Sequence, residues 1–363
     1  MASDDDDVSN LDIFRYAPRN VLVVLYAVFF PLIAISNLSV LYVLLSSAKM
    51  RTSTNIYITS ICFASFLVGL FTCISSLHEL TASEDIGTSH LTVCVMFVYL
   101  EIMAITACTL SFTATAVDRY RTIVQSNKPR FSLRATCCIL AGVWIVALLY
   151  ACRTFIQSAA SEEHESDEDT STTKDWLETN KTANGTTETM LKEHQEQRIC
   201  SNFLEDESDD FIFRVIDMFV IFLVPLIVMS VLYSLVAVKL WASKGPTNSS
   251  TRDKRKTLRL LLIIVALFFF CWSPFHLFEV IHDSLETQGL ELETASFSGA
   301  RVWSLVLAIS NSWLNPIVYC YLNRNFRVEL KKKIRYWRVC CCRSRVFPED
   351  NQQGTTETTQ GSD

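Results

Sequence analysis

The sequence is poor in glycine, proline and charged residues. Its 363 residues include 9 glycines and 8 prolines, and only 19% of them are charged. Collagen-like and low-complexity chains need far more glycine and proline, and soluble domains carry about 25% charged residues, with coiled coils carrying still more. Half of the residues are apolar. The composition therefore excludes collagen-like, disordered and coiled-coil classes.

Local signatures of enzymes are also missing. The chain has neither a His-Glu-x-x-His zinc motif nor a Gly-x-Ser-x-Gly nucleophile elbow, the patterns of metalloproteases and α/β-hydrolases. It shows no pair of inverted repeats, which is the usual mark of a transporter. We expect no catalytic residue, cofactor, metal site or nucleic-acid partner.

The chain does contain seven long apolar runs. Each approaches or exceeds about 18 residues, the length at which a helix can cross the hydrocarbon core of a bilayer. Seven such runs, separated by charged connections, are unlike the core helices of a soluble protein, so we predict an all-α bundle of seven transmembrane helices. The first run is too long, and its leader too acidic, for a cleavable signal peptide. The runs are Val21–Ser46, Ile56–Leu77, Leu91–Val117, Thr136–Ile156, Phe213–Leu240, Leu258–Ile281 and Val302–Leu322.

Lysine and arginine gather on one side of these runs. They follow runs 1, 3, 5 and 7, whereas acidic residues occupy the leader and the connections after runs 2 and 6; Arg15 and Arg19 in the leader go against this trend. Basic loops stay on the cytoplasmic side. We therefore predict a multi-pass protein of the cell membrane with an extracellular amino terminus and a cytoplasmic carboxyl terminus.

The connection between runs 4 and 5, at about residues 157–210, is the longest. From Ser161 to Asp210 it has 16 acidic against four basic residues, a composition typical of disorder. Asn180 and Asn184 begin glycosylation sequons on the predicted outer side. The predicted domains are residues 1–20, an acidic extracellular segment; 21–323, the membrane bundle; 324–342, a membrane-surface segment; and 343–363, a disordered cytoplasmic tail.

Three motifs occur in order at fixed places in the runs. They are Asp118-Arg119-Tyr120 after run 3, Cys271-Trp272-Ser273-Pro274 in run 6 and Asn315-Pro316-Ile317-Val318-Tyr319 at the end of run 7, with Asn37, Trp144 and Pro225 in runs 1, 4 and 5. Each motif alone is a weak signal. In this order and at these depths they closely resemble the rhodopsin-like G-protein-coupled receptors, most of all those of the neuropeptide type.

The resemblance implies a set of residues that switch during activation. An arginine at a membrane edge needs a partner or water. The resemblance implies that Arg119 pairs with Asp118 in the resting state and is freed to contact the G protein on activation. A plain membrane anchor is the alternative role for Arg119. Prolines remove backbone hydrogen bonds and kink helices. For the aromatic members, simple packing is the alternative. The implied set is Asp118, Arg119, Tyr120, Pro225, Tyr233, Phe268, Trp272, Pro274, Asn315, Pro316 and Tyr319.

The resemblance also assigns cysteines. It pairs Cys94, at the outer start of run 3, with Cys200, just before run 5, in a compartment where disulfides form. Cys340, Cys341 and Cys342 follow the basic stretch Phe326–Arg338, which resembles the membrane-surface helix of the family. We expect palmitoylation there, with unmodified thiols as the alternative. The eight cysteines inside the runs read as inert apolar residues.

Ionisable residues in the outer halves of the runs are candidate ligand contacts. Glu101 lies 18 residues before Arg119, on the same helix face and about 27 Å nearer the outside, and a carboxylate inside a membrane indicates function. Three acids beneath an acidic loop favour a cationic ligand. Internal pairing, such as Glu279 with Arg301, remains the alternative. The candidates are Glu101, Asp217, His276, Glu279 and Arg301, with Arg214 nearby.

A basic peptide is the leading hypothesis for the ligand. A biogenic-amine-like cation and an orphan or constitutively active receptor remain open, and a transporter or channel is the alternative from another class. Amine receptors of the family have serines where this chain has Asp217 and Ile221, and run 7 lacks the lysine that retinal needs. The implied partners are a heterotrimeric G protein, membrane lipids, and arrestin and receptor kinases acting on the tail.

Two departures from the family pattern stand out. Ser65 and Cys108 occupy the places of the aspartate and the helper serine that bind sodium in the family, so we expect no sodium sensitivity. Ser126 and Asn127 replace the proline and the bulky apolar residue that dock on the G protein. The class and the efficiency of coupling therefore stay open.

Overall fold

The computed structural model describes residues 19–81, 89–125, 127, 129, 131–156, 209–242, 249–286 and 295–344. Within these ranges all regular structure is helical. The elements are α2 (Arg19–Ser46), η1 (Ala48–Met50), α3 (Ser53–Thr81), α4 (Ser89–Ile123), α5 (Leu133–Ala151), α8 (Asp209–Asp217), η3 (Met218–Leu223), α9 (Val224–Ala242), α10 (Ser249–Glu286), α11 (Ala295–Leu322) and α12 (Arg324–Ser344).

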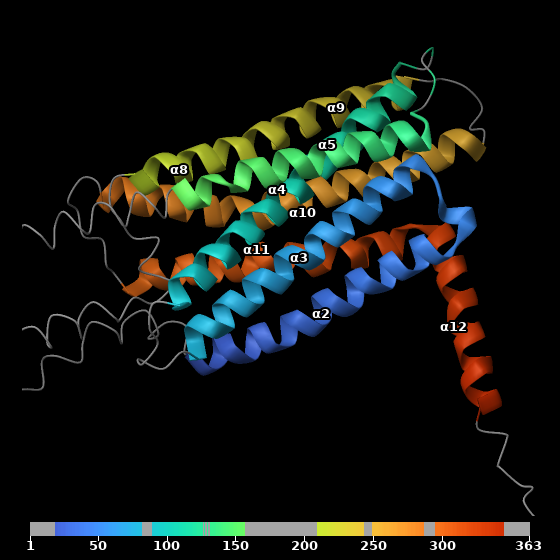
Figure 1. Cartoon of the computed structure of the whole chain (residues 1–363). Helices are drawn as coiled ribbons and strands as arrows, with labels where there is room; N and C mark the ends of the chain where they lie inside the picture. The colour runs from blue at the N-terminus through green and yellow to red at the C-terminus, as the bar shows by residue number, and fades with distance from the viewer. Residues whose placement is uncertain are drawn as a thin grey trace, which may run out of the picture.

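Seven stretches of the described chain are long and apolar enough to cross a membrane. Each corresponds to one predicted run: α5 continues through residues 153–156 into one stretch, and α8, η3 and α9 together form another. The seven lie side by side in a single bundle, and α12 leaves its end at a steep angle (Figure 1). The prediction of an all-α seven-helix bundle is therefore confirmed.

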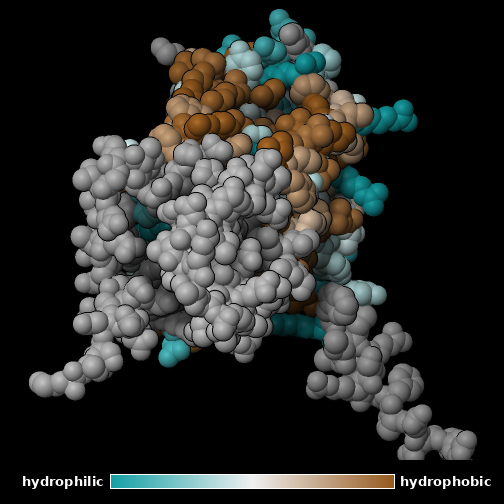
Figure 2. All heavy atoms as spheres, turned by 60° about the vertical axis from the view of Figure 1, so that its left-hand side comes forward, coloured by the Kyte–Doolittle hydropathy of each residue, from teal (hydrophilic) through white to brown (hydrophobic). Residues whose placement is uncertain are grey.

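The outside of the bundle is covered by large apolar side chains. Ile35 on α2, Val238 on α9 and Phe270 on α10 are each about two-thirds exposed. Figure 2 shows such side chains gathered into a broad apolar area on one face. An area of this kind would drive association in water. It suits a surface that is covered by lipid.

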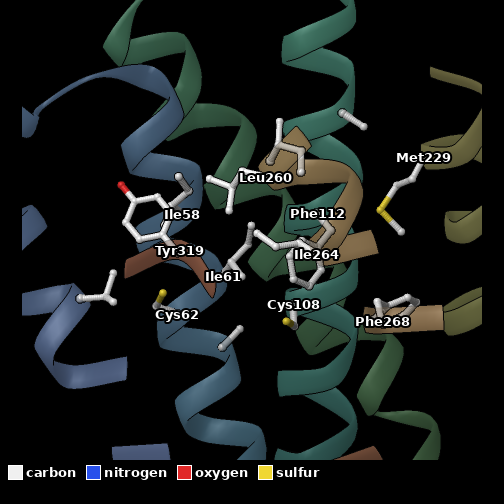
Figure 3. Packing of buried hydrophobic residues seen from close by; sticks show 14 of the residues in the cluster. Ile58, Ile61, Cys62, Cys108, Phe112, Met229, Leu260, Ile264, Phe268 and Tyr319 are labelled. Carbon is white, nitrogen blue, oxygen red and sulfur yellow. The ribbon is translucent and has the colours of Figure 1, made fainter. Parts of the chain in front are cut away.

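Side chains of α3, α4, α9, α10 and α11 meet in the core (Figure 3), and residues of α2 extend it. On α10 the buried side chains of Leu260, Ile264 and Phe268 recur every four residues, the spacing of one helix face. The ring of Phe268 lies 6.1 Å from that of Phe112 on α4. This packing fixes the face of α10 that carries Trp272 one turn further on.

A buried amide connects two of the helices that prolines interrupt. Pro31, Pro274 and Pro316 lie inside α2, α10 and α11. Asn37 donates to the backbone oxygens of Ile33 and Ser312, both at 2.9 Å, and so joins α2 to α11. The predicted Pro274 and Pro316, like Pro31, therefore sit within continuous helices.

One element was not predicted from the sequence. Residues Met218–Leu223 form a π-helix between α8 and α9, just before the buried Pro225. A π-turn holds one residue more than an α-turn, and such turns are frequent at functional sites. Here it follows Asp217 directly, so the extra residue in its turn sets how α8, which carries Asp217, is rotated relative to α9.

Helix α12 is anchored at its start. The Asn323 side chain accepts a hydrogen bond from the Phe326 backbone at 3.1 Å, and Phe326 is fully buried with its ring 5.3 Å from that of Tyr319. Lys333 donates to the backbone oxygen of Ser46 at 3.4 Å. The helix predicted at Phe326–Arg338 is thus present and longer.

Several predicted sites lie outside what the structure describes. These are the side chains of Cys94, Cys340, Cys341 and Cys342, together with Cys200, Asn180, Asn184 and Ser126. The disulfide, the glycosylation, the palmitoylation and the division into domains therefore stay predictions.

Candidate functional site

We call the end of the bundle that is predicted to face outward the outer end, and the opposite end the inner end. At the outer end, α8, α10 and α11 meet at the carboxylate of Glu279. Arg301 on α11 donates to it through Nε at 2.6 Å and through a terminal nitrogen at 3.3 Å, and Arg214 on α8 forms a second ion pair with it. The Glu279 side chain is 10% exposed. Glu279 therefore joins three helices. The internal ion pair with Arg301, which the sequence left as the alternative, is present in the structure.

A separate ion pair, between Asp217 and Arg153, lies where α5 meets α8. Asp217 accepts a hydrogen bond from the Tyr150 hydroxyl at 2.6 Å and pairs with Arg153. The Arg153 guanidinium also lies over the rings of Tyr150 and Phe213, 5.5 and 5.6 Å from their centroids. These contacts position Asp217 immediately before the π-helix.

Glu101 differs from the other two acids. Its carboxylate accepts a hydrogen bond from Thr72 of α3 at 2.5 Å. Among the described residues this hydroxyl is the only hydrogen-bond partner of the carboxylate, and no arginine forms an ion pair with it. A carboxylate inside a membrane helix is costly without a counter-ion. Glu101 is thus the predicted acid best able to accept a cation.

An aromatic group lies between the π-helix η3 and α10. The His276 ring stacks on Trp272 with centroids 5.8 Å apart and approaches Phe222 of the π-helix at 5.0 Å. The indole nitrogen of Trp272 and Nε2 of His276 are buried, with no hydrogen-bond partner among the described residues. Polar atoms of this kind usually find a partner, so both are available to a bound group.

The structure brings the five predicted ligand contacts to the outer half of the bundle, but it does not join them into one cluster. Glu279 and Arg301 are in direct contact, whereas Glu101, Asp217 and His276 each have separate partners. Two of the three acids face arginines, so the outer half holds nearly balanced charges rather than bare negative charge. No group of three or more metal-binding side chains occurs among the described residues.

The inner end of α4 carries the second predicted site. Arg119 pairs with Asp118 at 2.6 Å, and Asp118 is 2% exposed. Arg119 also donates to the hydroxyl of Thr54 in the first turn of α3. Tyr120 packs partly buried against the core. The arginine is therefore held by its neighbour and by a second helix.

Two tyrosines predicted as switches are buried near this end. Tyr233 on α9 and Tyr319 on α11 are each 2% exposed. The Tyr319 hydroxyl donates to the Asn55 side chain of α3 at 3.3 Å, and Asn315 donates to Asn311 at 3.0 Å. Arg255 of α10 donates to the Leu240 backbone oxygen of α9 at 2.9 Å. These bonds join α3 to α11 and α9 to α10 at their inner ends, whereas the bond between Asn315 and Asn311 lies within α11.

Sequence reasoning missed Thr54 and Arg153. Arg153 carried a signal, because an arginine at the outer end of a membrane run goes against the distribution of the basic residues. Thr54 lies just after a short basic connection, at the depth of Arg119, but nothing in its sequence indicates which way it faces.

Comparison with known proteins agrees with this architecture. Residues 36–319 match the 7 transmembrane receptor (rhodopsin family). The neuromedin-K receptor of Rattus norvegicus is 28% identical over 87% of this chain and 62% of its own length, and the substance-P receptor of Canis lupus familiaris is 28% identical over 88% and 72%. The human neuromedin-K receptor is 26% identical over 86% and 61%. This chain thus spans about three-fifths of the neuromedin-K receptors. It belongs to the rhodopsin family of seven-transmembrane receptors.

Proposed function

We propose that this chain is a cell-surface receptor that binds a cationic peptide and activates a heterotrimeric G protein. The observation that carries the proposal is Glu101, an acid in the outer half of α4 whose carboxylate has a hydroxyl partner but no arginine. A cationic group of a ligand is the counter-ion that it lacks. The amino terminus lies outside and the basic inner loops face the cytoplasm in this proposal.

Activation follows from a shift between two states of the bundle. A ligand must bind one state more tightly to shift the equilibrium. Glu279 near the outer end of α10 and Arg255 near its inner end are both bonded to neighbouring helices. A ligand that changes the contacts of Glu279 can therefore shift α10 and weaken the contact of Arg255 at its other end. The response that we propose is release of Arg119 toward a G protein.

A peptide is preferred to a small amine for two reasons. The relatives are named as receptors for neuromedin K and for substance P, which places them among the peptide-type receptors. In addition, Asp217 is already bonded to Tyr150 and Arg153, and Ile221 is a buried apolar residue. Neither of these two positions offers a free hydroxyl group to a catechol.

The test is a G-protein activation assay in cells that express the full chain, with a library of basic peptides. We expect at least one basic peptide to activate, and Glu101→Gln to weaken its potency about tenfold or more, because a charge-assisted bond is lost. Glu329→Gln, in the exposed helix α12, is the control for charge. Arg119→Ala is the inactive control. Unchanged potency in Glu101→Gln removes Glu101 from the proposal, and a response to amines alone favours the amine alternative.

The proposal extends to regulation of the tail. Threonines 355, 356, 358 and 359 offer phosphate acceptors to receptor kinases, and phosphate clusters are recognised by basic surfaces such as that of arrestin. Alanine at all four positions should reduce agonist-driven arrestin recruitment, while G-protein activation persists. Recruitment that is unchanged contradicts this part alone.

A further inference from the structure

The eight cysteines whose side chains are described fall into two groups. Cys62, Cys73, Cys108 and Cys271 are buried between helices, and Cys320 is partly buried. Cys137, Cys138 and Cys152 are exposed, and all three lie on the fourth membrane span. In a bilayer, exposure on this span means contact with lipid or with its headgroups. The sequence alone does not separate these groups, because helix rotation decides which thiols face outward.

Cys137 and Cys138 lie close to one end of the span. Ser132 caps α5 by accepting the Ala135 backbone N–H at 3.2 Å, so the helix begins at Leu133. Four residues of helix place Cys137 only about 6 Å inside that end. Arg134 is exposed beside them, and the preceding segment is held by Arg121 stacked over Phe131 at 4.4 Å. In the proposed orientation, this is the boundary between hydrocarbon and cytoplasm.

The outward face of α5 is recessed next to these thiols. The opposite face carries the buried Thr136, Leu140, Ala147 and Ala151. Outward, Ala141 and Gly142 are exposed, and a Cβ atom added to Gly142 would meet nothing within 4 Å. Ile145 and Leu149, which are 57% and 68% exposed, continue the face toward the outer end. An exposed apolar strip, called the track below, thus starts at the thiols and runs along the helix toward its other end.

We infer that Cys137 and Cys138 form an S-acylation site that takes a long-chain fatty acyl group from acyl-coenzyme A. The cysteine sulfur attacks the thioester carbonyl, the bond from that carbonyl to the coenzyme A sulfur breaks, and coenzyme A leaves as the thiol with the proton that cysteine gives up. Cysteines next to the membrane boundary are the usual targets of this exchange. From Cys138 to Leu149 the track extends about 16 Å, roughly one leaflet, so it matches a saturated chain.

The inference uses the orientation in the proposed function, but not its ligand or its coupling. Cys152 is the matched comparison, because it is exposed on the same span at the opposite end. Acyl-coenzyme A is a cytoplasmic donor. Only one end of the span can therefore be acylated, and the identity of that end reports the orientation.

The test labels the full chain in cells with an alkynyl fatty acid, followed by detection of hydroxylamine-sensitive label. Cys340, Cys341 and Cys342 are first replaced by serine, so that the tail contributes nothing. We expect this variant to keep label, and the further change Cys137→Ser/Cys138→Ser to remove about nine-tenths of it, whereas Cys152→Ser leaves it unchanged. A polyethylene glycol mass-tag assay should count one or two thioesters per chain, lost in the same variant.

Three results would overturn the inference. They are no label once the tail cysteines are gone, label that survives Cys137→Ser/Cys138→Ser, and label that depends on Cys152. Cys137→Ala/Cys138→Ala repeats the test with an apolar replacement, and surface staining of each variant checks that it folds. G-protein activation by the same variants is measured separately, so failure of the receptor proposal leaves the labelling result intact.

Discussion

Arg119 has two acceptors, and only one of them is its neighbour in the sequence. The bond to Thr54 spans α3 and α4, and hydrogen bonds to charged groups contribute about 1.5–3 kcal/mol. Thr54→Val removes this bond but keeps the shape of the side chain. If about 1 kcal/mol of it favours the resting state, basal G-protein activation should rise about fivefold.

The control for Thr54→Val is Thr59→Val on the same helix. The Thr59 hydroxyl donates to the backbone oxygen of Asn55 within α3, so its loss should leave basal activity unchanged. Nucleotide exchange in membranes without ligand measures both variants. Equal basal activity in Thr54→Val and in the unaltered chain would show that Asp118 alone restrains Arg119.

Glu279 is shared by two arginines, so its loss should affect stability first. Removing one partner from a buried ion pair leaves an uncompensated charge and costs about 3 kcal/mol or more. We expect Glu279→Gln to lower the unfolding temperature of the detergent-solubilised receptor by roughly 5–10 °C. Glu329→Gln is the comparison, since Glu329 is bonded to Lys332 in α12, outside the membrane. An unchanged unfolding temperature in Glu279→Gln would mean that solvent already screens this cluster.

Ser65 and Cys108 face each other with their side chains 3.4 Å apart. Neither is a carboxylate, and hard cations such as sodium need oxygen ligands of high charge. We predict that replacing sodium by N-methylglucamine leaves ligand affinity and unfolding temperature unchanged. Ser65→Asp supplies the missing carboxylate and serves as the positive arm. A sodium-dependent shift in the unaltered chain would show that another oxygen cluster binds the ion.

Single residues were predictable where chemistry alone singles them out. An acid within an apolar run, such as Glu101 or Asp217, is visible in any sequence. Its partner is not, because Tyr150 and Arg153 reach Asp217 only when α5 and α8 have particular rotations. Contacts of this kind depend on packing between helices that are distant in sequence.

Helix α10 illustrates what hydropathy predicts about an element. The apolar run begins at Leu258, but the helix begins at Ser249, because a helix does not end where the hydrocarbon does. The π-helix at Met218–Leu223 was not predictable in this way. Its residues are as apolar as those of the α-helix that follows, so composition carries no signal for the extra residue in the turn.

The π-helix leads to a prediction about deletions. Each residue turns an α-helix by about 100°, and a π-turn is equivalent to one inserted residue. Deleting Val220 within it should restore an α-turn and leave Asp217 and Pro225 facing as they do now. Deleting Val231 in α9 should rotate the part of α9 that follows it by about 100° relative to the part that precedes it. Both residues are exposed, so lost packing of the deleted side chain is comparable.

We expect the Val220 deletion to reach the cell surface at close to the normal level and the Val231 deletion to be retained inside the cell. Surface staining of a tagged chain, divided by total expression, measures this difference. Equal loss in both variants would indicate that the π-turn is required for the fold itself.

For the whole molecule, the net charge of −6 hides a division of charge between two ends. The described inner end carries Lys49, Arg121, Arg255 and the lysines of α12. The hydrogen bond from Lys332 lowers the pKa of the Glu329 carboxyl, and the charge of Lys333 adds to this effect. The described outer end carries acids that pair with Arg153, Arg214 and Arg301. In the described part of the chain, charge is thus nearly compensated at the outer end and in excess at the inner end.

This excess predicts the orientation of the chain. Basic segments resist translocation across the membrane, so an epitope tag at the amino terminus should stain intact cells, and one at the carboxyl terminus should stain only after permeabilisation. Replacing Lys331, Lys332 and Lys333 by glutamine should not invert the chain, because the loops after α4 and α9 keep their basic residues. Asn180→Gln/Asn184→Gln should remove a glycan-dependent mass shift. A carboxyl-terminal tag that stains intact cells would contradict the orientation, and it would place Cys152 rather than Cys137 on the cytoplasmic side.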